Sequence, residues 1–287
     1  MTAPSSSQRP ALALRLGVTG ARQLDPMRIP RLSAQLRSVL ADPREHLRRL
    51  AATNGGVAAA YEHTNGRSPE PRLRFLSPLA RGADRLAARE ALDAGYTLHV
   101  PMPFPLAEYE RDFDTPEDLA EFRELLGKAD EGYLALDGAR GPEMNRAYET
   151  VGRFVVRHCD LLIAIWDGGP SGGRGGSAQI LRYAAGSGVP VCWLHATEDR
   201  SPVWIAGIQD LVVPRPDPEP IEAPLHAWLD TLIVPPVDKP GTGPSPWLAW
   251  LSAANRRAAP LPREELANVP QAASVSPERR EPGPNRR

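Results

Sequence analysis

Short apolar runs alternate along this chain with longer segments in which apolar residues recur at helical spacing. The runs predict strands at 11–18, 73–79, 97–100, 133–136, 160–166 and 190–194. The helical spacing predicts helices at 29–51, 82–94, 105–113, 116–128, 143–158 and 177–185, the first of them split into two pieces at Pro43. Strands that alternate with helices are typical of parallel βαβ units. The fold class is therefore α/β, a doubly wound and mostly parallel Rossmann-like sheet with helices on both faces.

The pattern also divides the chain into segments of different character. Residues 1–10 are expected to be a flexible tail, 11–235 the Rossmann-like domain, 236–267 a Pro-rich extension with one helix near 247–257, and 268–287 a disordered tail. The turn-rich stretch 54–71 is expected to be a surface loop, and one further helix is expected within 220–232. The apolar share of 41% is sufficient for a core.

Charge and cysteine content limit the partners. The net charge of −1 gives no field that would draw the chain to nucleic acid or a membrane surface, so nucleic acid is an unexpected partner. No apolar run is long enough to span a membrane, and the first residues do not form a signal peptide. Cys159 and Cys192 each lie in an apolar run, which favours core packing in a reducing cytoplasm over a disulfide or a metal site. We expect no metal and no cofactor.

A glycine-rich loop between residues 166 and 177 is the strongest candidate for chemistry. It follows the most apolar strand and precedes a helix, so its backbone amides and the helix N-terminus can face an anion. The alternative is a flexible surface loop without a ligand. The candidate ligand-binding residues here are Asp167, Gly168, Gly173, Gly175, Gly176 and Ser177.

The end of the first predicted strand carries a second candidate loop. Thr19 and Gly20 suit a phosphate or ribose contact, Gly17 precedes them, and Arg22 can clamp an anion with two hydrogen bonds. An ordinary turn with a solvated arginine is the alternative.

A third candidate loop follows the second predicted strand. It contains Ser77, Gly82, which permits a tight turn, and Asp84, which the dipole of the next helix favours with or without a ligand. After the third strand, Tyr109 can stack on a base or pack within its helix. Tyr148 is placed at the start of a helix, where it can belong to the core.

These segments together resemble the SLOG superfamily, named for its SMF/DprA and LOG members. The matching segments are Gly17 to Arg22, Ser77 to Asp84, Pro103 to Tyr109, Asp160 to Gly168 and Gly173 to Ser177. The resemblance implies a Rossmann-like fold over residues 11–196 that binds nucleotides or nucleotide-derived signals. The pattern differs at Ala21, where histidine is usual, and at Ser177, where threonine is usual.

The resemblance also bears on catalysis, because its hydrolase members carry acidic residues on the helix after the glycine loop. Gln179 and Ile180 occupy those places here and cannot ionise. We therefore expect a binding module that senses a nucleotide-derived ligand of the ADP-ribose type, in a bacterial stress or antiphage system, with output through a homo-oligomer or an effector partner. The alternative is a nucleotide N-glycosidic hydrolase that uses Asp167 or Glu108 as its carboxylate. Single-stranded DNA binding is the third class.

Overall fold

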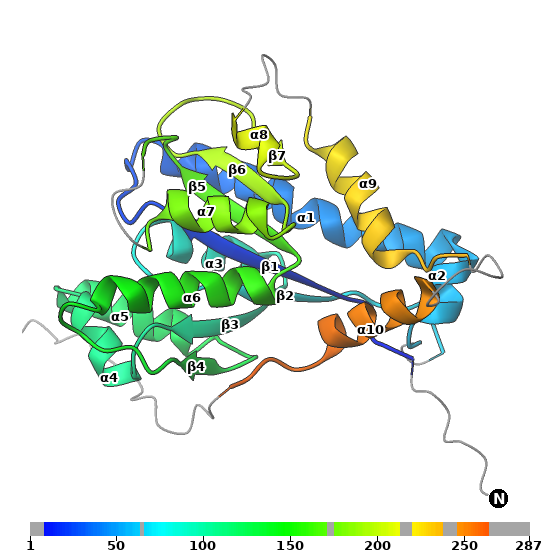
Figure 1. The fold of residues 1–287 in the computed structure, drawn as a ribbon, viewed down its shortest axis with the longest axis horizontal. Coiled ribbons are helices and arrows are strands. Elements are labelled where there is room, and N and C mark those ends of the chain that lie inside the picture. Colours follow the sequence, from blue (N-terminus) through cyan, green and yellow to red (C-terminus); the bar gives the residue numbers. More distant parts are fainter. Residues whose placement is uncertain (1–8, 64–65, 171–174, 213–219, 238–245, 264–287) are drawn as a thin grey trace, which may run out of the picture.

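The computed structural model describes residues 9–63, 66–170, 175–212, 220–237 and 246–263. Its centre is a seven-stranded sheet in the order β4-β3-β2-β1-β5-β6-β7. All neighbouring strands are parallel except β6 and β7, which pair antiparallel. The predicted α/β fold with a mostly parallel sheet is therefore confirmed (Figure 1).

The strands are β1 (Ala13–Gly20), β2 (Arg72–Leu76), β3 (Thr97–Met102), β4 (Tyr133–Ala135), β5 (Leu161–Trp166), β6 (Val191–His195) and β7 (Val203–Ile205). The helices are α1 (Ile29–Thr53), α2 (Gly55–Ala60), α3 (Ala83–Asp93), α4 (Leu106–Tyr109), the 3-10 turn η1 (Glu110–Asp112), α5 (Pro116–Leu126), α6 (Met144–His158), α7 (Ser177–Gly186), α8 (Gln209–Val212), α9 (Glu222–Ile233) and α10 (Pro246–Ala258).

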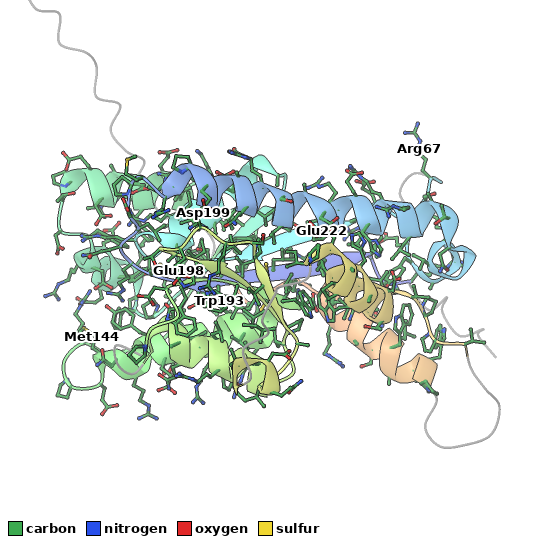
Figure 2. All side chains as sticks on the ribbon, turned by 90° about the horizontal axis from the view of Figure 1, so that it is seen from above. Arg67, Met144, Trp193, Glu198, Asp199 and Glu222 are labelled. Carbon is green, nitrogen blue, oxygen red and sulfur yellow. The ribbon has the colours of Figure 1, made fainter. Side chains whose placement is uncertain are left out.

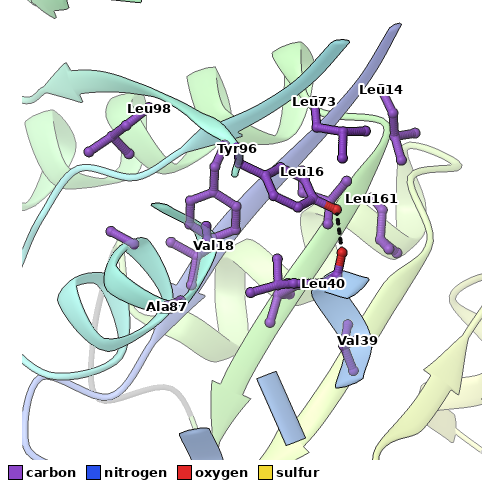
Figure 3. Close-up of a cluster of buried hydrophobic side chains, with 14 of the residues drawn as sticks. Leu14, Leu16, Val18, Val39, Leu40, Leu73, Ala87, Tyr96, Leu98 and Leu161 are labelled. Atoms are coloured by element: carbon purple, nitrogen blue, oxygen red, sulfur yellow. Dashed lines mark hydrogen bonds between the residues drawn. The ribbon is translucent and has the colours of Figure 1, made fainter. Parts of the chain in front are cut away.

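Helices cover both faces of the sheet, which gives three layers (Figure 2). Helices α1 and α3 pack on one face, and α6 and α7 pack on the other. Apolar side chains of β1, β2 and β3 meet α1 and α3 in the larger core, where the Tyr96 hydroxyl donates a hydrogen bond of 2.9 Å to the Leu40 carbonyl (Figure 3). The first five residues of β5 are buried, as its apolar run predicted.

Two local expectations need correction, and two short elements were not predicted. Helix α1 runs unbroken through Pro43, because the buried residues on both sides of that proline pack on the same core and compensate for the lost hydrogen bond. The expected loop 54–71 contains α2, whose first turn is capped by the Asn54 side chain accepting from the Val57 amide at 3.1 Å. Strand β7 and helix α8 had no recognised pattern, because each is only three or four residues long.

The C-terminal extension packs directly on the central sheet through α10. Arg15 of β1 and Arg74 of β2 are register partners, and both guanidinium groups bind carbonyls at the end of α10. Arg15 Nη2 donates to Arg256 O at 2.7 Å, and Arg74 Nη1 donates to Arg257 O at 3.0 Å. Cations at the negative end of a helix are favourable. The expected helix in the extension is thus present, and the boundary at residue 235 stays a prediction.

The cysteines, the helix lengths and the chain ends are the remaining features for which the sequence led to an expectation. Cys159 and Cys192 are both buried and carry free thiols. Within the described ranges, no helix has the length and apolar character that a membrane span requires, and no cluster of three acidic, histidine or cysteine side chains could hold a metal. The expected disordered tail, 268–287, and most of the expected N-terminal tail lie outside the described residues.

Candidate functional site

A crevice of about 410 Å³ lies where the strand order of the sheet reverses. Strand β1 pairs with β2 on one side and with β5 on the other, so the loops after these strands diverge and leave space between them. The crevice is lined by Val18, Thr19, Gly20, Ala21, Arg22, Pro78, Ala80, Asp84, Tyr109, Met144, Asn145, Tyr148, Val151, Gly152, Gly175, Gly176, Ser177 and Ile180. It is the position at which α/β sheets bind ligands.

One wall of the crevice is the N-terminus of α7. Helix α7 begins at Ser177, with Gly176 as its N-cap residue. The amides of a first helical turn lack partners inside the helix and carry the positive end of its dipole. Gly175 is held differently, because its amide donates to Gln179 Oε1 at 2.7 Å. This wall therefore favours an anionic group beside Gly176 and Ser177.

Of the two glycines before α7, Gly175 requires glycine and Gly176 does not. Gly175 has φ of +83°, and a Cβ there would lie 2.8 Å from the Glu149 backbone nitrogen. Gly176 has φ −73° and ψ 158°, an extended conformation that any residue adopts. The loop is thus pinned against α6 by Gly175.

Arg22 contributes the cationic side chain of the crevice. It is exposed, and its guanidinium carbon lies 4.6 Å from the centre of the Tyr148 ring. Tyr148 is itself fixed, because its hydroxyl donates to Asp112 Oδ2 at 2.6 Å and Phe104 packs edge-on against its ring at 5.5 Å. The stacked guanidinium is exposed at the rim, where it can bind a phosphate.

Asp84 is the carboxylate that lines the crevice within the described chain. Burial raises its pKa to about 7, against the weaker lowering effects of the Ala80 amide and of Arg22 and Arg85. At neutral pH the group therefore exists in both forms and can donate or accept a hydrogen bond. A buried group with such a shift beside a crevice is typical of a functional site.

We expect Asp84→Asn to change the pH dependence of stability. The native carboxyl keeps its proton up to about pH 7, whereas an unfolded chain releases it near pH 4. Folding thus binds a proton between these values, and Asp84 lowers stability as pH rises through them. At pH 8 the variant should be more stable by roughly 2–4 kcal/mol, with little difference at pH 4.

Urea unfolding at pH 4 and pH 8 measures this difference. Asp93→Asn is the matched control, because Asp93 is exposed at the other end of α3. An equal change at both pH values in Asp84→Asn would contradict the assigned ionisation.

Eight of the fourteen residues predicted to bind the ligand line the crevice. They are Thr19, Gly20, Arg22, Asp84, Tyr109, Gly175, Gly176 and Ser177. Five others, Gly17, Ser77, Gly82, Asp167 and Gly168, do not line it. Gly173 lies outside the described residues. The topology therefore brings all three predicted loops to one place, and ligand contact itself stays a prediction.

Three of the five residues outside the crevice have structural roles. A Cβ on Gly17 would lie 2.5 Å from Val155 Cγ1, so this glycine permits α6 to approach β1. The fully buried Ser77 hydroxyl donates to the Asp84 carbonyl at 3.0 Å. Gly82 has φ of +77°, and a Cβ there would lie 2.5 Å from the Ala21 carbonyl oxygen.

The two carboxylates considered for catalysis also lie outside the crevice lining. Asp167 Oδ1 accepts from the Gly169 amide at 3.0 Å, which forms a local turn. Glu108 pairs with Arg111 at 2.9 Å and with Arg140 at 3.2 Å. The structure therefore gives no support to either residue as a catalytic carboxylate.

The sequence interpretation missed the wall that α6 provides. Met144, Asn145, Tyr148, Val151 and Gly152 line the crevice from one side of this helix. Their spacing follows a helical face, which the sequence also predicts for residues that only pack in the core. Only Gly152 stood out in the sequence, as a glycine within a predicted helix. In the structure, a Cβ there would lie 2.6 Å from Ile180 of α7.

Two of the solved structures that are similar to this chain are DNA processing proteins. DNA processing protein A from Helicobacter pylori, described by its single-stranded DNA binding mode, matches with a TM-score of 0.40 and 16% identity, over 78% of this chain and 81% of that chain. DNA processing protein A from Streptococcus pneumoniae matches with a TM-score of 0.39 and 15% identity, over 69% of this chain and 60% of that chain. No protein-family model and no curated protein matches the sequence. At this identity the similarity shows the fold alone.

These neighbours correct two expectations drawn from the sequence. The sequence led us to expect a sensor of a nucleotide-derived signal and to set nucleic acid aside as a partner. Both similar structures are DNA processing proteins, and one is described as binding single-stranded DNA. Net charge is an average over the whole surface and does not describe the charge of one crevice.

Proposed function

We propose that the crevice binds one nucleotide of a single-stranded nucleic acid. The observation that carries the proposal is the convergence of the α7 N-terminus, the Arg22 guanidinium and the hydroxyl-bearing Thr19 and Ser177 on one space of about 410 Å³. We also infer, from the order of the motifs, that the domain is of the SLOG type.

The phosphate of the bound nucleotide is assigned to the α7 end of the crevice. Backbone amides at the start of a helix and an arginine side chain both favour phosphate oxygens. Arg22 also offers the face of its guanidinium that points away from Tyr148, and bases stack on such planes. Asp84, which carries a proton part of the time at neutral pH, is placed to bond a sugar hydroxyl or a base edge.

The form of the crevice favours a strand over an enclosed small molecule. It is open to solvent, so the nucleotides before and after the bound one can continue outside. Few phosphates are contacted in this arrangement, and the net charge of −1 adds no long-range attraction. We therefore expect modest affinity and a slope of about −1 in the logarithm of the binding constant against that of salt concentration, since a single strand contributes about −0.7 per phosphate.

Arg22→Ala is expected to weaken binding of a thymidine oligonucleotide of about ten residues by roughly 10- to 100-fold, because one or two charged hydrogen bonds are lost. Fluorescence anisotropy with a labelled strand measures the affinity. The helicobacter protein named above serves as positive control. Arg49→Ala removes the same charge from an exposed position on α1 and should bind as the unaltered protein does.

The proposal is wrong if Arg22→Ala and Arg49→Ala bind the strand equally well. It is also wrong if thymidine monophosphate occupies the crevice while the oligonucleotide fails to compete with it.

A further inference from the structure

A second cavity, of about 420 Å³, lies at the amino ends of the strands, opposite the crevice. It is bounded by the end of α6, the start of β5 and the end of α10 with the residues that follow it. Its lining comprises Arg15, Arg157, His158, Cys159, Asp160, Ala253, Arg256, Arg257, Ala259, Pro260, Leu261 and Pro262. We call it the α10 cleft.

The α10 cleft is strongly cationic. Four arginines, Arg15, Arg157, Arg256 and Arg257, line it against one carboxylate, Asp160. Burial raises the pKa of Asp160 to about 6, so this group carries less than a full charge in mildly acidic solution. Four guanidinium groups around one space repel one another, and a multiply charged anion between them relieves that repulsion.

Arg15 provides an observation independent of the charge count. Only 7% of the residue is exposed, and its Nη2 is bound to the Arg256 and Ala259 carbonyls. Its Nε is buried and has no hydrogen-bond partner in the described structure. A buried donor without an acceptor costs about 1–3 kcal/mol, which adds to the cost of holding this cation inside the chain.

The other arginines differ in how firmly they are held. Arg257 is buried and donates from Nη2 to the Leu232 carbonyl at 2.9 Å. Arg157 and Arg256 are exposed, and each has a hydrogen bond to a neutral hydroxyl, Tyr183 for the first and Ser252 for the second. Neither ion-pairs with a carboxylate among the described salt bridges. The cleft thus has two buried arginines inside, Arg15 and Arg257, and two exposed arginines at its rim, Arg157 and Arg256.

We propose that the α10 cleft binds a small phosphate-bearing anion. Guanidinium groups match the geometry of phosphate oxygens with paired hydrogen bonds, and the volume exceeds that of a single ion. Arg157 and Arg256 bind the phosphate at the rim, and the buried Arg15 and Arg257 add positive charge behind it.

The test is calorimetric titration of the full chain with inorganic phosphate, pyrophosphate and ribose 5-phosphate at constant ionic strength. The variant is the pair Arg157→Gln and Arg256→Gln, which leaves the buried Arg15 and Arg257 unchanged. We expect binding to the unaltered protein and at least a tenfold loss in the variant, the loss that about one charged hydrogen bond contributes. Comparison of the three affinities also distinguishes a site for free phosphate from a site for a sugar phosphate.

Two controls keep the result specific. The pair Arg49→Gln and Arg182→Gln changes the charge equally at exposed positions outside the cleft and should leave the affinity unaltered. Arg22→Ala should leave unaltered the binding component that is lost in the Arg157 and Arg256 variant, which separates this site from the crevice. Melting temperature without ligand shows that each variant is folded. Phosphate should raise it in the unaltered protein and in the control variants, but much less in the Arg157 and Arg256 variant.

Three outcomes overturn the proposal. These are no binding of any of the three anions to the unaltered protein, equal affinity in the Arg157 and Arg256 variant, or a loss of affinity for an oligonucleotide without any binding of the small anions. If the variant with both substitutions is unfolded, Arg256→Gln alone should still weaken phosphate binding, and no change there is equally contradictory.

Discussion

A chain that ends at residue 245 is expected to lose most of its stability. Removing α10 takes away the carbonyls that bind Arg15 and Arg74 through five hydrogen bonds, and exposes the side chains that pack under Trp250 and Ala254. At about 1 kcal/mol per hydrogen bond and 2–3 kcal/mol for the buried tryptophan, the loss is at least 5 kcal/mol. Typical domains have only about 5–15 kcal/mol in total.

Urea unfolding followed by circular dichroism measures this loss. A chain that ends at residue 263 keeps α10 and is the matched control, for which no change in midpoint is expected. If the shorter chain unfolds cooperatively at the same urea concentration as the control, α10 is dispensable and the domain ends near residue 235, as the sequence pattern indicated.

Gly176→Val is expected to abolish binding of the oligonucleotide while the fold is preserved. The extended backbone at Gly176 is a conformation that a β-branched residue adopts, so the substitution requires no change in φ and ψ. The new side chain would narrow the crevice at the start of α7, where the phosphate is assigned. Loss of two or three amide contacts at about 1.5–2 kcal/mol each amounts to a hundredfold or more in affinity.

Gly186→Val is the control on the same helix. Gly186 is the last residue of α7, and no heavy atom lies within 4 Å of a Cβ placed there. Both variants should melt within a few degrees of the unaltered protein. Oligonucleotide binding by Gly176→Val at the affinity of Gly186→Val would move the phosphate site away from α7.

The sequence was a sound guide wherever a pattern was long and regular. The run from Leu161 to Trp166 predicted a buried strand, and the structure places it beside β1 near the centre of the sheet. Because parallel strands expose their carboxyl ends along one edge, the loops carrying Thr19, Asp84 and Ser177 had to approach one another. The candidate site therefore followed from topology together with loop composition.

The roles of individual residues within those loops could not be predicted from the sequence. Gly17, Ser77 and Gly82 have the residue types of a phosphate site, yet each serves packing or a turn. Asp84 is at a helix start in the sequence, and only the surrounding chain shows that its carboxyl is buried enough to hold a proton near neutral pH. Composition cannot separate these cases, because both need small or polar residues at chain reversals.

The sequence by itself determined the order of the helices and strands, the parallel sheet and the edge at which its loops meet, since these depend on local periodicity and chain connectivity. The tertiary structure alone decided which side chains share an environment. Arg15 and Arg74 interrupt apolar strands and have their partners in α10, more than 180 residues further along the chain. Such contacts depend on distance in space, which no local pattern of residues encodes.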